Sequence, residues 1–382
     1  MAHSTDFIEL HKDCPEEQDS LLRVDTLPGK GRAYIATQPI QAGTLVHISK
    51  PVAVVVAQEW IPETCSWCFT FKYPKRMRIR AITEEEAKNS KQPKDMMFCS
   101  EECRQCWRNY GYEGEWELLV RVTHELDQEH KKRLEINEEE PVKLDISEDE
   151  WVDLQDNEIL ARWVDEVWEK QLPHTSPRNL DKAERTMCRV VAHALARKQF
   201  EHVFKKSVPG FDDLLMVQNN ELAHFRSCCQ GDKIQRGYVP PGVVQVMEIY
   251  NFFAAALEKT GLEFTHQTFR DVYFREMSNS FGMWEMPKRA GDGVTDDLEL
   301  LGWGIFASAV FFNHSCDANI DKVRQERNIA FIANRDIAEG EEACISYGCV
   351  TDGLTERRQR LLENYYFMCN CTRCKQEEQS LA

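Results

Sequence analysis

The amino-acid sequence predicts a mixed α+β fold, because strand-like and helix-like stretches occupy different parts of the chain. The first 60 residues contain GRAYIATQPI and GTLVHISKPVAVVVA, which are rich in the β-branched residues that favour strands. Apolar residues recur with the helical period in the middle of the chain, and strand-like stretches return in GWGIFASAVFF and NIAFIANRDI. With 382 residues, of which 42% are hydrophobic, the chain is large enough to bury substantial cores.

The composition changes after the first strand-like region. Between residues 61 and 114 the chain is rich in Cys, Lys and Arg and has no long periodic apolar stretch. This composition is typical of a small module that a bound metal ion stabilises in place of an apolar core. We therefore predict a zinc module in this part of the chain.

Residues 115–277 are predicted to be mostly helical. One helix has its start signal at Asp181 and Glu184, and a second is expected to end at Gly261. Their apolar faces consist of Met187, Val190, Val191, Ala194 and Leu195 in the first helix, and of Val243, Val246, Met247, Tyr250, Phe253, Ala254 and Leu257 in the second. We interpret both faces as packing surfaces rather than binding sites.

The charge of the chain bears on its partners. The formal net charge is −17, which disfavours a zinc-dependent nucleic-acid-binding protein, because binding to phosphates needs a basic surface. Basic protein substrates suit this charge better. Residues 135–158 contain eleven carboxylates and a single Lys143. We interpret them as a solvated loop or exposed helix face, and the alternative is an acidic patch that attracts Lys-rich substrates.

The sequence also indicates a compartment. No stretch reaches the ~18 consecutive apolar residues of a membrane-spanning helix, and MAHSTDFIEL lacks the charged start and apolar centre of a secretory signal. We therefore expect an intracellular protein, in the nucleus, the cytoplasm or both. In a reducing compartment the 15 Cys are expected to be metal ligands or buried thiols rather than disulfides.

Two groups of cysteines have the spacing of zinc ligands. In the tail, FMCNCTRC supplies three, and tetrahedral zinc needs a fourth from elsewhere, for which Cys316 in FFNHSCDANI is the candidate. The earlier group pairs CSWC with CSEEC, and Cys106 is an alternative to Cys103. The two ligand sets are thus Cys316, Cys369, Cys371 and Cys374, and Cys65, Cys68, Cys99 and Cys103. Free surface thiols are the alternative for the earlier group, and we interpret Cys14, Cys188, Cys228, Cys229, Cys344 and Cys349 as packing residues or bystanders.

Four motifs occur in a characteristic order along the chain. They are GKG at 29–31, NHSCDAN at 313–319, EGEEACISYG at 339–348 and the tail CNCTRC. In these motifs the chain resembles the SET-domain lysine methyltransferases. The interruption by CSWC…FCSEEC and a helical stretch makes it similar to the SET and MYND branch of that family. The resemblance spans nearly the whole chain, and the last hundred residues carry its most specific part.

The resemblance implies a split, knot-like SET β-fold with an inserted zinc module, a helical insert and a Cys-rich post-SET tail. The implied divisions are residues 1–60 and 278–349 for the two parts of the SET domain, 61–114 for a MYND-like zinc module, 115–277 for the helical insert and 350–382 for the tail. Nothing between Cys68 and Cys99 is Cys or His, so only one zinc ion can be assigned to the module. Because the sequence stops soon after Cys374, we also expect no C-terminal helical-repeat domain.

The resemblance also implies an activity, the transfer of methyl groups from S-adenosylmethionine to a lysine of a histone or non-histone protein. Asn313 and His314 match the cofactor-binding dipeptide, Tyr347 matches the catalytic tyrosine that also contacts the cofactor, and Phe367 matches an aromatic residue that stacks on adenine. The glycine turn that lets the backbone approach the cofactor falls on Gly29, Lys30 and Gly31. The two cysteine sets would hold two zinc ions, and no membrane association is implied.

The chemistry explains these residue types. Methyl transfer to lysine is an in-line displacement by a neutral amine, so the enzyme must align the reactants and deprotonate the amine. A narrow apolar channel lowers the pKa of the lysine by desolvation, and the Tyr347 hydroxyl orients the amine or the methyl group. The alternative for Tyr347 is a buried structural tyrosine.

A rival interpretation is a catalytically silent adaptor whose MYND-like module binds a partner peptide. The basic stretch FKYPKRMRIR is expected either to contact a partner or an acidic surface, or simply to be a solvated loop. An adaptor has no need of a cofactor pocket. The joint presence of Gly29, Gly31, Asn313, His314 and Tyr347 therefore favours the enzyme.

Overall fold

The computed structural model describes residues 21–83, 85–86, 96–134, 150–201, 208–286 and 298–381. The described residues form a mixed α+β fold, as the sequence predicts. They divide into two compact units. The first unit consists of Met1–Lys50, Gly282–Leu301 and Ser308–Ala382, and the second of Pro51–Phe281 and Gly302–Ala307. The predicted division into five segments stays a prediction.

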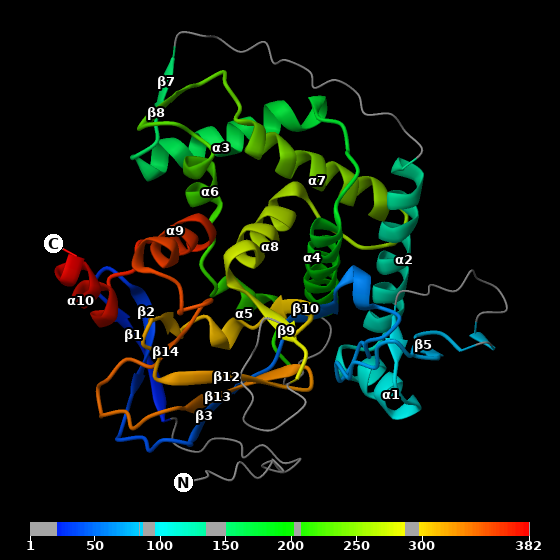
Figure 1. Ribbon diagram of the computed structural model, residues 1–382. Coiled ribbons are helices and arrows are strands. Elements are labelled where there is room, and N and C mark those ends of the chain that lie inside the picture. The colour runs from blue at the N-terminus through cyan, green and yellow to red at the C-terminus, as the bar shows by residue number, and fades with distance from the viewer. Residues whose placement is uncertain are drawn as a thin grey trace. The chain divides into compact units, whose positions relative to one another are not determined.

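The first unit is built on small sheets (Figure 1). The strands β1 (Leu22–Leu27) and β2 (Gly31–Ala36) form an antiparallel hairpin, β12 (Ile320–Gln325), β13 (Asn328–Ala333) and β3 (Leu45–Ser49) form an antiparallel sheet in that order, and β11 (Asn313–His314) pairs in parallel with β14 (Cys344–Ile345). The strand-rich character predicted for the first 60 residues and for the stretches before the cysteine-rich tail is thereby confirmed within the described residues. Residues 1–20 lie outside the described residues.

The turn of the β1–β2 hairpin contains the GKG motif. Gly29 has φ 72° and Gly31 has φ 77°, which are left-handed conformations that residues with a Cβ adopt only with strain. The Lys30 amide N–H donates to the Leu27 carbonyl at 3.1 Å and closes the turn. Glycine at both positions is therefore required by the backbone itself.

The C-terminal end of the first unit is helical. Helix α9 (Leu354–Tyr365) ends at Tyr366, whose φ of 60° gives a left-handed cap. Helix α10 (Thr372–Leu381) follows after a short connection and is drawn in red in Figure 1. The chain passes from one unit to the other between Lys50 and Pro51, in β9 (Ser280–Trp284), in β10 (Leu300–Ile305) and after Ala307.

In the second unit, β4 (Ala53–Val56) pairs antiparallel with β10. A Cβ added to Gly302 would lie 2.1 Å from the Val55 carbonyl oxygen, and one added to Gly304 would lie 2.4 Å from the Ala53 carbonyl oxygen. The GWG sequence therefore allows two backbones to approach more closely than larger residues permit.

The cysteine-rich segment contains a helix that the sequence pattern did not reveal. Strands β5 (Ile79–Arg80) and β6 (Met97–Phe98) form a short antiparallel pair that leads into α1 (Glu101–Tyr110). The Ser100 side chain caps this helix by accepting from the Cys103 N–H. Only Trp107 of α1 is buried. No apolar stripe was therefore present to be recognised.

The rest of the second unit is mostly helical, as predicted. Its elements are α2 (Glu115–Arg133), β7 (Trp151–Asp153), α3 (Asn157–Gln171), α4 (Lys182–Glu201), α5 (Phe211–Leu215), α6 (Glu221–Ser227), β8 (Lys233–Gln235), α7 (Pro241–Leu257) and α8 (His266–Asn279), with 3-10 turns at Gln58–Trp60 and Leu172–His174. None of the helices within the described ranges combines the length and apolar character that crossing a membrane would require.

The two helices predicted from periodicity are confirmed as α4 and α7. In α7 the buried surface is wider than the predicted stripe, since Ile249, Phe252 and Ala256 are buried as well. Helix α7 contacts both α2 and α4, and a helix with neighbours on two sides buries more than one stripe. Most of the acidic segment 135–158 lies outside the described residues.

Candidate active site and metal centres

The NHSCDAN and EGEEACISYG motifs are joined by the β11–β14 pair in the first unit. In this pair Asn313 lies opposite Cys344 and His314 opposite Ile345. Asn319, which is only 2% exposed, fastens the two motifs together. Its amide nitrogen donates to the Glu342 carbonyl at 2.9 Å, and its amide oxygen accepts from the Cys344 N–H at 2.7 Å.

His314 lies between the backbone of Tyr347 and the sulfur of Cys316. The Tyr347 N–H donates to His314 Nδ1 at 3.1 Å, so in the neutral ring the proton is on Nε2. Nε2 lies 3.3 Å from Cys316 Sγ. Burial lowers the pKa of His314 to about 4, so the ring is neutral near pH 7. The imidazole is therefore oriented as an N–H donor to sulfur.

Aromatic side chains gather around Tyr347. Its ring centroid lies 4.8 Å from that of Tyr365, 5.4 Å from that of His314 and 6.3 Å from that of Phe367. The Tyr347 hydroxyl donates to the Phe312 carbonyl oxygen at 3.0 Å. Burial raises the pKa of Tyr347, so its hydroxyl remains protonated. The structure thus brings together three of the residues to which the family resemblance assigns cofactor binding and catalysis.

Glu342 connects the glycine turn to Asn313, the residue before His314. Its carboxylate forms an ion pair with Lys30 Nζ at 2.5 Å and accepts from Asn313 Nδ2 at 2.9 Å. Burial alone would lower the pKa of Lys30, but the Glu342 carboxylate outweighs this effect and holds it above its ordinary value. The turn residues Gly29 and Gly31 flank Lys30, so all the predicted cofactor residues belong to one connected region.

The sequence reasoning missed Glu342. The motif EGEEACISYG predicts no role for any of its three glutamates. The only signal was position, since Glu342 lies two residues before Cys344 at the start of β14.

The four C-terminal cysteines form one group. The sulfur atoms of Cys316, Cys369, Cys371 and Cys374 all lie within 4.8 Å of one another. Cys316 Sγ is 4.0 Å from Cys369 Sγ and 3.5 Å from Cys374 Sγ. Four sulfurs around a tetrahedral zinc ion are expected about 3.8 Å apart, given a Zn–S bond of about 2.3 Å. The group therefore fits zinc.

The N-terminal cysteines, in the second unit, form a similar group from Cys65, Cys68, Cys99 and Cys103, all within 4.8 Å of one another. Cys99 Sγ lies 3.6 Å from Cys68 Sγ and 3.4 Å from Cys103 Sγ. The hydrogen bond between the Cys65 and Cys68 thiols lowers the pKa of Cys68, against the raising effect of burial, and raises the pKa of Cys65. Cys106 is exposed and is not part of the group.

The C-terminal cysteine group and the aromatic residues share one apolar cluster. Leu361 of α9 is buried with Cys316, Cys369 and Cys374. Tyr347, Val350, Leu354, Tyr365, Phe367 and Cys371 pack against it. The tail that supplies three sulfurs therefore also holds Phe367 near His314, at a ring-centroid distance of 6.2 Å.

The two phenylalanines before Asn313 are buried to different extents. Phe312 is fully buried and stacks on Phe331 at 4.3 Å. Phe311 is only half-buried, with Arg32 5.0 Å over its ring. The preceding strand β10 ends at Ile305, so the phenylalanines lie in a turn that leads into β11.

Comparison with known proteins identifies the family of this chain. The SET domain family model matches residues 31–348. The chain is 26% identical to the potential protein lysine methyltransferase SET6 of Saccharomyces cerevisiae, over 92% of this chain and 94% of that protein. It is 21% identical to the histone-lysine N-methyltransferase ASHR2 of Arabidopsis thaliana, over 94% of this chain and 73% of that protein.

Proteins of the SET and MYND type match only in part. The chain is 35% identical to human histone-lysine N-methyltransferase SMYD3, over 22% of this chain and 19% of that protein. SET6 and ASHR2, which match over nearly the whole of this chain, are not named as SET and MYND proteins. The SET family model also covers most of the chain. The chain belongs to the SET-domain family.

Proposed function

We propose that this chain is an S-adenosylmethionine-dependent protein-lysine N-methyltransferase. The observation that carries the proposal is the connection of His314, Tyr347 and Phe367 within one aromatic group of the first unit. Family membership and the names of the relatives that match over nearly the whole chain support it.

In this proposal the residues around Glu342 bind the amino-acid end of the cofactor. Lys30 and Asn313 present polar groups that now meet the Glu342 carboxylate, and Gly29 and Gly31 leave space beside the backbone, since a Cβ at either position would meet nothing within 4 Å. Phe367 stacks on the adenine ring. When bound, the cofactor supplies an electrophilic methyl group.

The proposed role of Tyr347 is orientation of the substrate amine. Its hydroxyl is protonated and already points at the Phe312 carbonyl, so it offers a fixed dipole rather than a base. Loss of the lysine proton is favoured by desolvation in apolar surroundings, which Phe312 and Tyr365 provide. A purely structural role for Tyr347 is the alternative.

We propose that both cysteine groups hold structural zinc. Four thiolates close the coordination shell and leave no open position for substrate, so neither ion takes part in the chemistry. In this proposal residues 61–114 form a reduced MYND-type module with one zinc ion, and residues 350–382 form the post-SET tail.

The proposed substrate is a lysine in a protein, histone or non-histone. The net charge of −17 favours a basic segment around that lysine. Binding of labelled S-adenosylmethionine is the first test, because a silent adaptor has no need of the cofactor. Saturable binding that His314→Ala abolishes would support the enzyme, and no binding by the zinc-loaded chain would refute it.

The zinc module supports a second candidate function, the binding of an acidic partner peptide. Tyr73 is 66% exposed and stacks on Phe71, and Lys72, Lys75 and Arg78 beside it are exposed. Exposed aromatic and basic side chains together suit an acidic peptide with apolar residues. If Tyr73→Ala and Lys75→Glu both leave the affinity for acidic peptides unchanged, this second function is excluded.

A further inference from the structure

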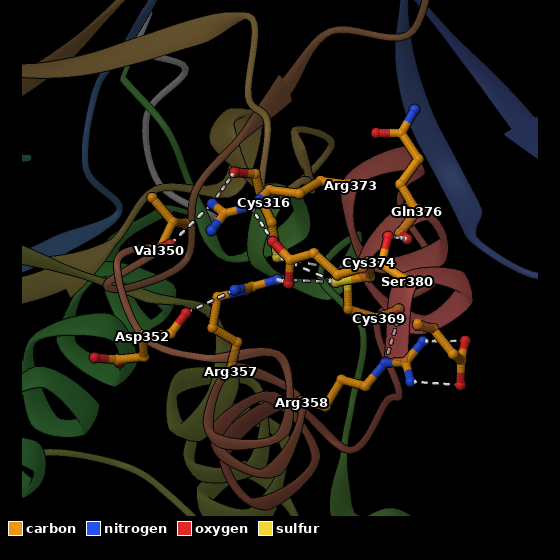
Figure 2. Close-up of polar contacts among 12 residues, drawn as sticks. Cys316, Val350, Asp352, Arg357, Arg358, Cys369, Arg373, Cys374, Gln376 and Ser380 are labelled. Carbon is orange, nitrogen blue, oxygen red and sulfur yellow. Dashed lines mark hydrogen bonds and ion pairs between the residues drawn. The ribbon is translucent and has the colours of Figure 1, made fainter. Parts of the chain in front are cut away.

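A buried arginine lies against the C-terminal cysteine group (Figure 2). The side chain of Arg357, on α9, is only 2% exposed. Its Nη2 lies 3.7 Å from Cys374 Sγ and 2.6 Å from Glu377 Oε2, and its Nη1 donates to the Asp352 carbonyl at 2.6 Å.

Two other arginines near the group contact its backbone instead. Arg358 Nε donates to the Cys369 carbonyl at 3.1 Å, and Arg373 Nη1 donates to the Cys316 carbonyl at 3.3 Å. Both pair with glutamates of α10, and both are more exposed than Arg357. As Figure 2 shows, the guanidinium of Arg357 contacts a cysteine sulfur, whereas those of Arg358 and Arg373 contact carbonyl oxygens of the cysteines.

The charge of the group explains why a cation is needed there. Four thiolates and one divalent zinc ion carry a formal net charge of −2. Cys374 is 0% exposed, Cys369 2% and Cys316 4%, so this charge is taken out of water. Burying an unpaired charge is costly, and a buried guanidinium beside the sulfur lowers this cost, although it also pairs with the partly exposed Glu377. In the N-terminal group only Cys65 is buried, so water can screen much of the charge.

We propose that Arg357 is a positioning residue of the C-terminal zinc site. It holds the Cys374 thiolate by an N–H···S hydrogen bond and compensates part of the charge of the group, and thereby slows the loss of the ion. Its planar fork contacts sulfur, the Asp352 carbonyl and the Glu377 carboxylate at once, which the single ammonium of a lysine cannot do. The inference rests on zinc at this site, as proposed above, and does not depend on methyl transfer.

Zinc release from the full-length chain tests the proposal. The zinc-loaded chain is mixed with a chromogenic chelator, and the release phase that Cys371→Ser lacks is assigned to the C-terminal site. Arg357→Met is expected to speed this phase about 10- to 100-fold, the range by which losing a partner of a metal ligand usually lowers metal affinity. Arg357→Lys should release zinc at a rate between those of the wild type and Arg357→Met. The matched control Arg358→Lys should release zinc as the wild type does. An unchanged rate of zinc release from the N-terminal site shows that a variant chain is folded.

Cobalt spectra separate a direct effect on sulfur from a general loosening. In the cobalt-loaded chain, loss of an N–H···S bond raises the energy of the sulfur electrons, so the sulfur-to-cobalt charge-transfer band moves to longer wavelength. The shift is expected in Arg357→Met and Arg357→Lys and not in Arg358→Lys. If Arg357→Met does not fold, the band of Arg357→Lys decides.

Unchanged release rates and an unchanged band in both Arg357 variants would overturn the inference. A wild-type chain with a single zinc ion that Cys68→Ser loses and Cys371→Ser keeps would also overturn it, because the C-terminal site would then hold no ion. A wild-type chain that holds two zinc ions but methylates nothing would overturn the proposed function and leave this inference standing.

Discussion

The side chains around β11 and β14 each serve more than one neighbour. His314 accepts from the Tyr347 backbone and faces a sulfur, while Glu342 binds both Lys30 and Asn313. A substitution here therefore removes several contacts, and isosteric changes are the informative ones. Tyr347 and Phe367 allow such changes, because each presents an aromatic ring whose role can be tested separately.

Tyr347→Phe tests the hydroxyl alone. The ring keeps its packing on Tyr365 and loses only the hydrogen bond to the Phe312 carbonyl. Cofactor affinity and the melting temperature should stay near wild type, while turnover falls at least about tenfold or the number of methyl groups added changes, because the hydroxyl acts mainly in the transition state. Steady-state rates and product masses measure this. Equal rates and equal methylation would assign Tyr347 a structural role.

Phe367→Ala tests stacking on the cofactor. Loss of the ring should weaken S-adenosylmethionine binding by about 1 to 3 kcal/mol, the usual value for a base on an aromatic side chain. Calorimetric titration gives the affinity. The control is Leu362→Ala, an exposed position on α9, which should bind the cofactor as the wild type does. If Phe367→Ala binds as tightly as the control, adenine lies elsewhere.

At the scale of elements, α8 carries a buried carboxyl group that the proposed chemistry does not use. Glu276 is 2% exposed and accepts from the Ser280 hydroxyl at 3.0 Å. Burial raises its pKa from 4.5 to about 7, since the ionised form loses its hydration. The folded state therefore binds the proton of Glu276 more tightly than the unfolded chain does.

This shift predicts how stability depends on pH. The contribution of Glu276 is fully present below pH ~4.5 and is lost as the pH rises through about 7, a loss of up to about 3 kcal/mol in the free energy of unfolding. Glu276→Gln should lack this component and be more stable than wild type at pH 8.5. Urea unfolding from pH 5 to 8.5 measures it, with the exposed Glu258→Gln as control. Parallel pH curves for wild type and Glu276→Gln would show that Glu276 does not titrate in this range.

The sequence predicts an element well when the residues of that element stabilise it, and poorly when residues far away in the chain do. The apolar period of α4 and α7 was sufficient to predict both helices, because each helix buries a continuous face. Helix α1 has one buried residue, and β11 and β14 are two residues long, so they depend on distant partners that no local pattern reveals. The cysteine groups were predictable because thiol spacing is specific to metal sites. Arg357 was not, since arginines in a helix are normally exposed.

At the scale of the whole molecule, each compact unit has its own cysteine group. The C-terminal group lies in the first unit with the aromatic residues, and the N-terminal group lies in the second. Cys371→Ser and Cys68→Ser should each leave one zinc ion per chain by elemental analysis. Cys371→Ser should also weaken cofactor binding and turnover together, because it loosens the tail that carries Phe367. Equal cofactor affinity in the two variants would contradict this link.

Methyl transfer to a lysine tests the central claim most directly. The zinc-loaded wild-type chain is incubated with isotopically labelled S-adenosylmethionine and the proteins of a cell extract, and the labelled peptides are identified by mass spectrometry. We predict label on lysine side chains, within basic segments, that is lost with His314→Ala. A wild-type chain that holds two zinc ions but labels no lysine would contradict the account and favour the silent adaptor.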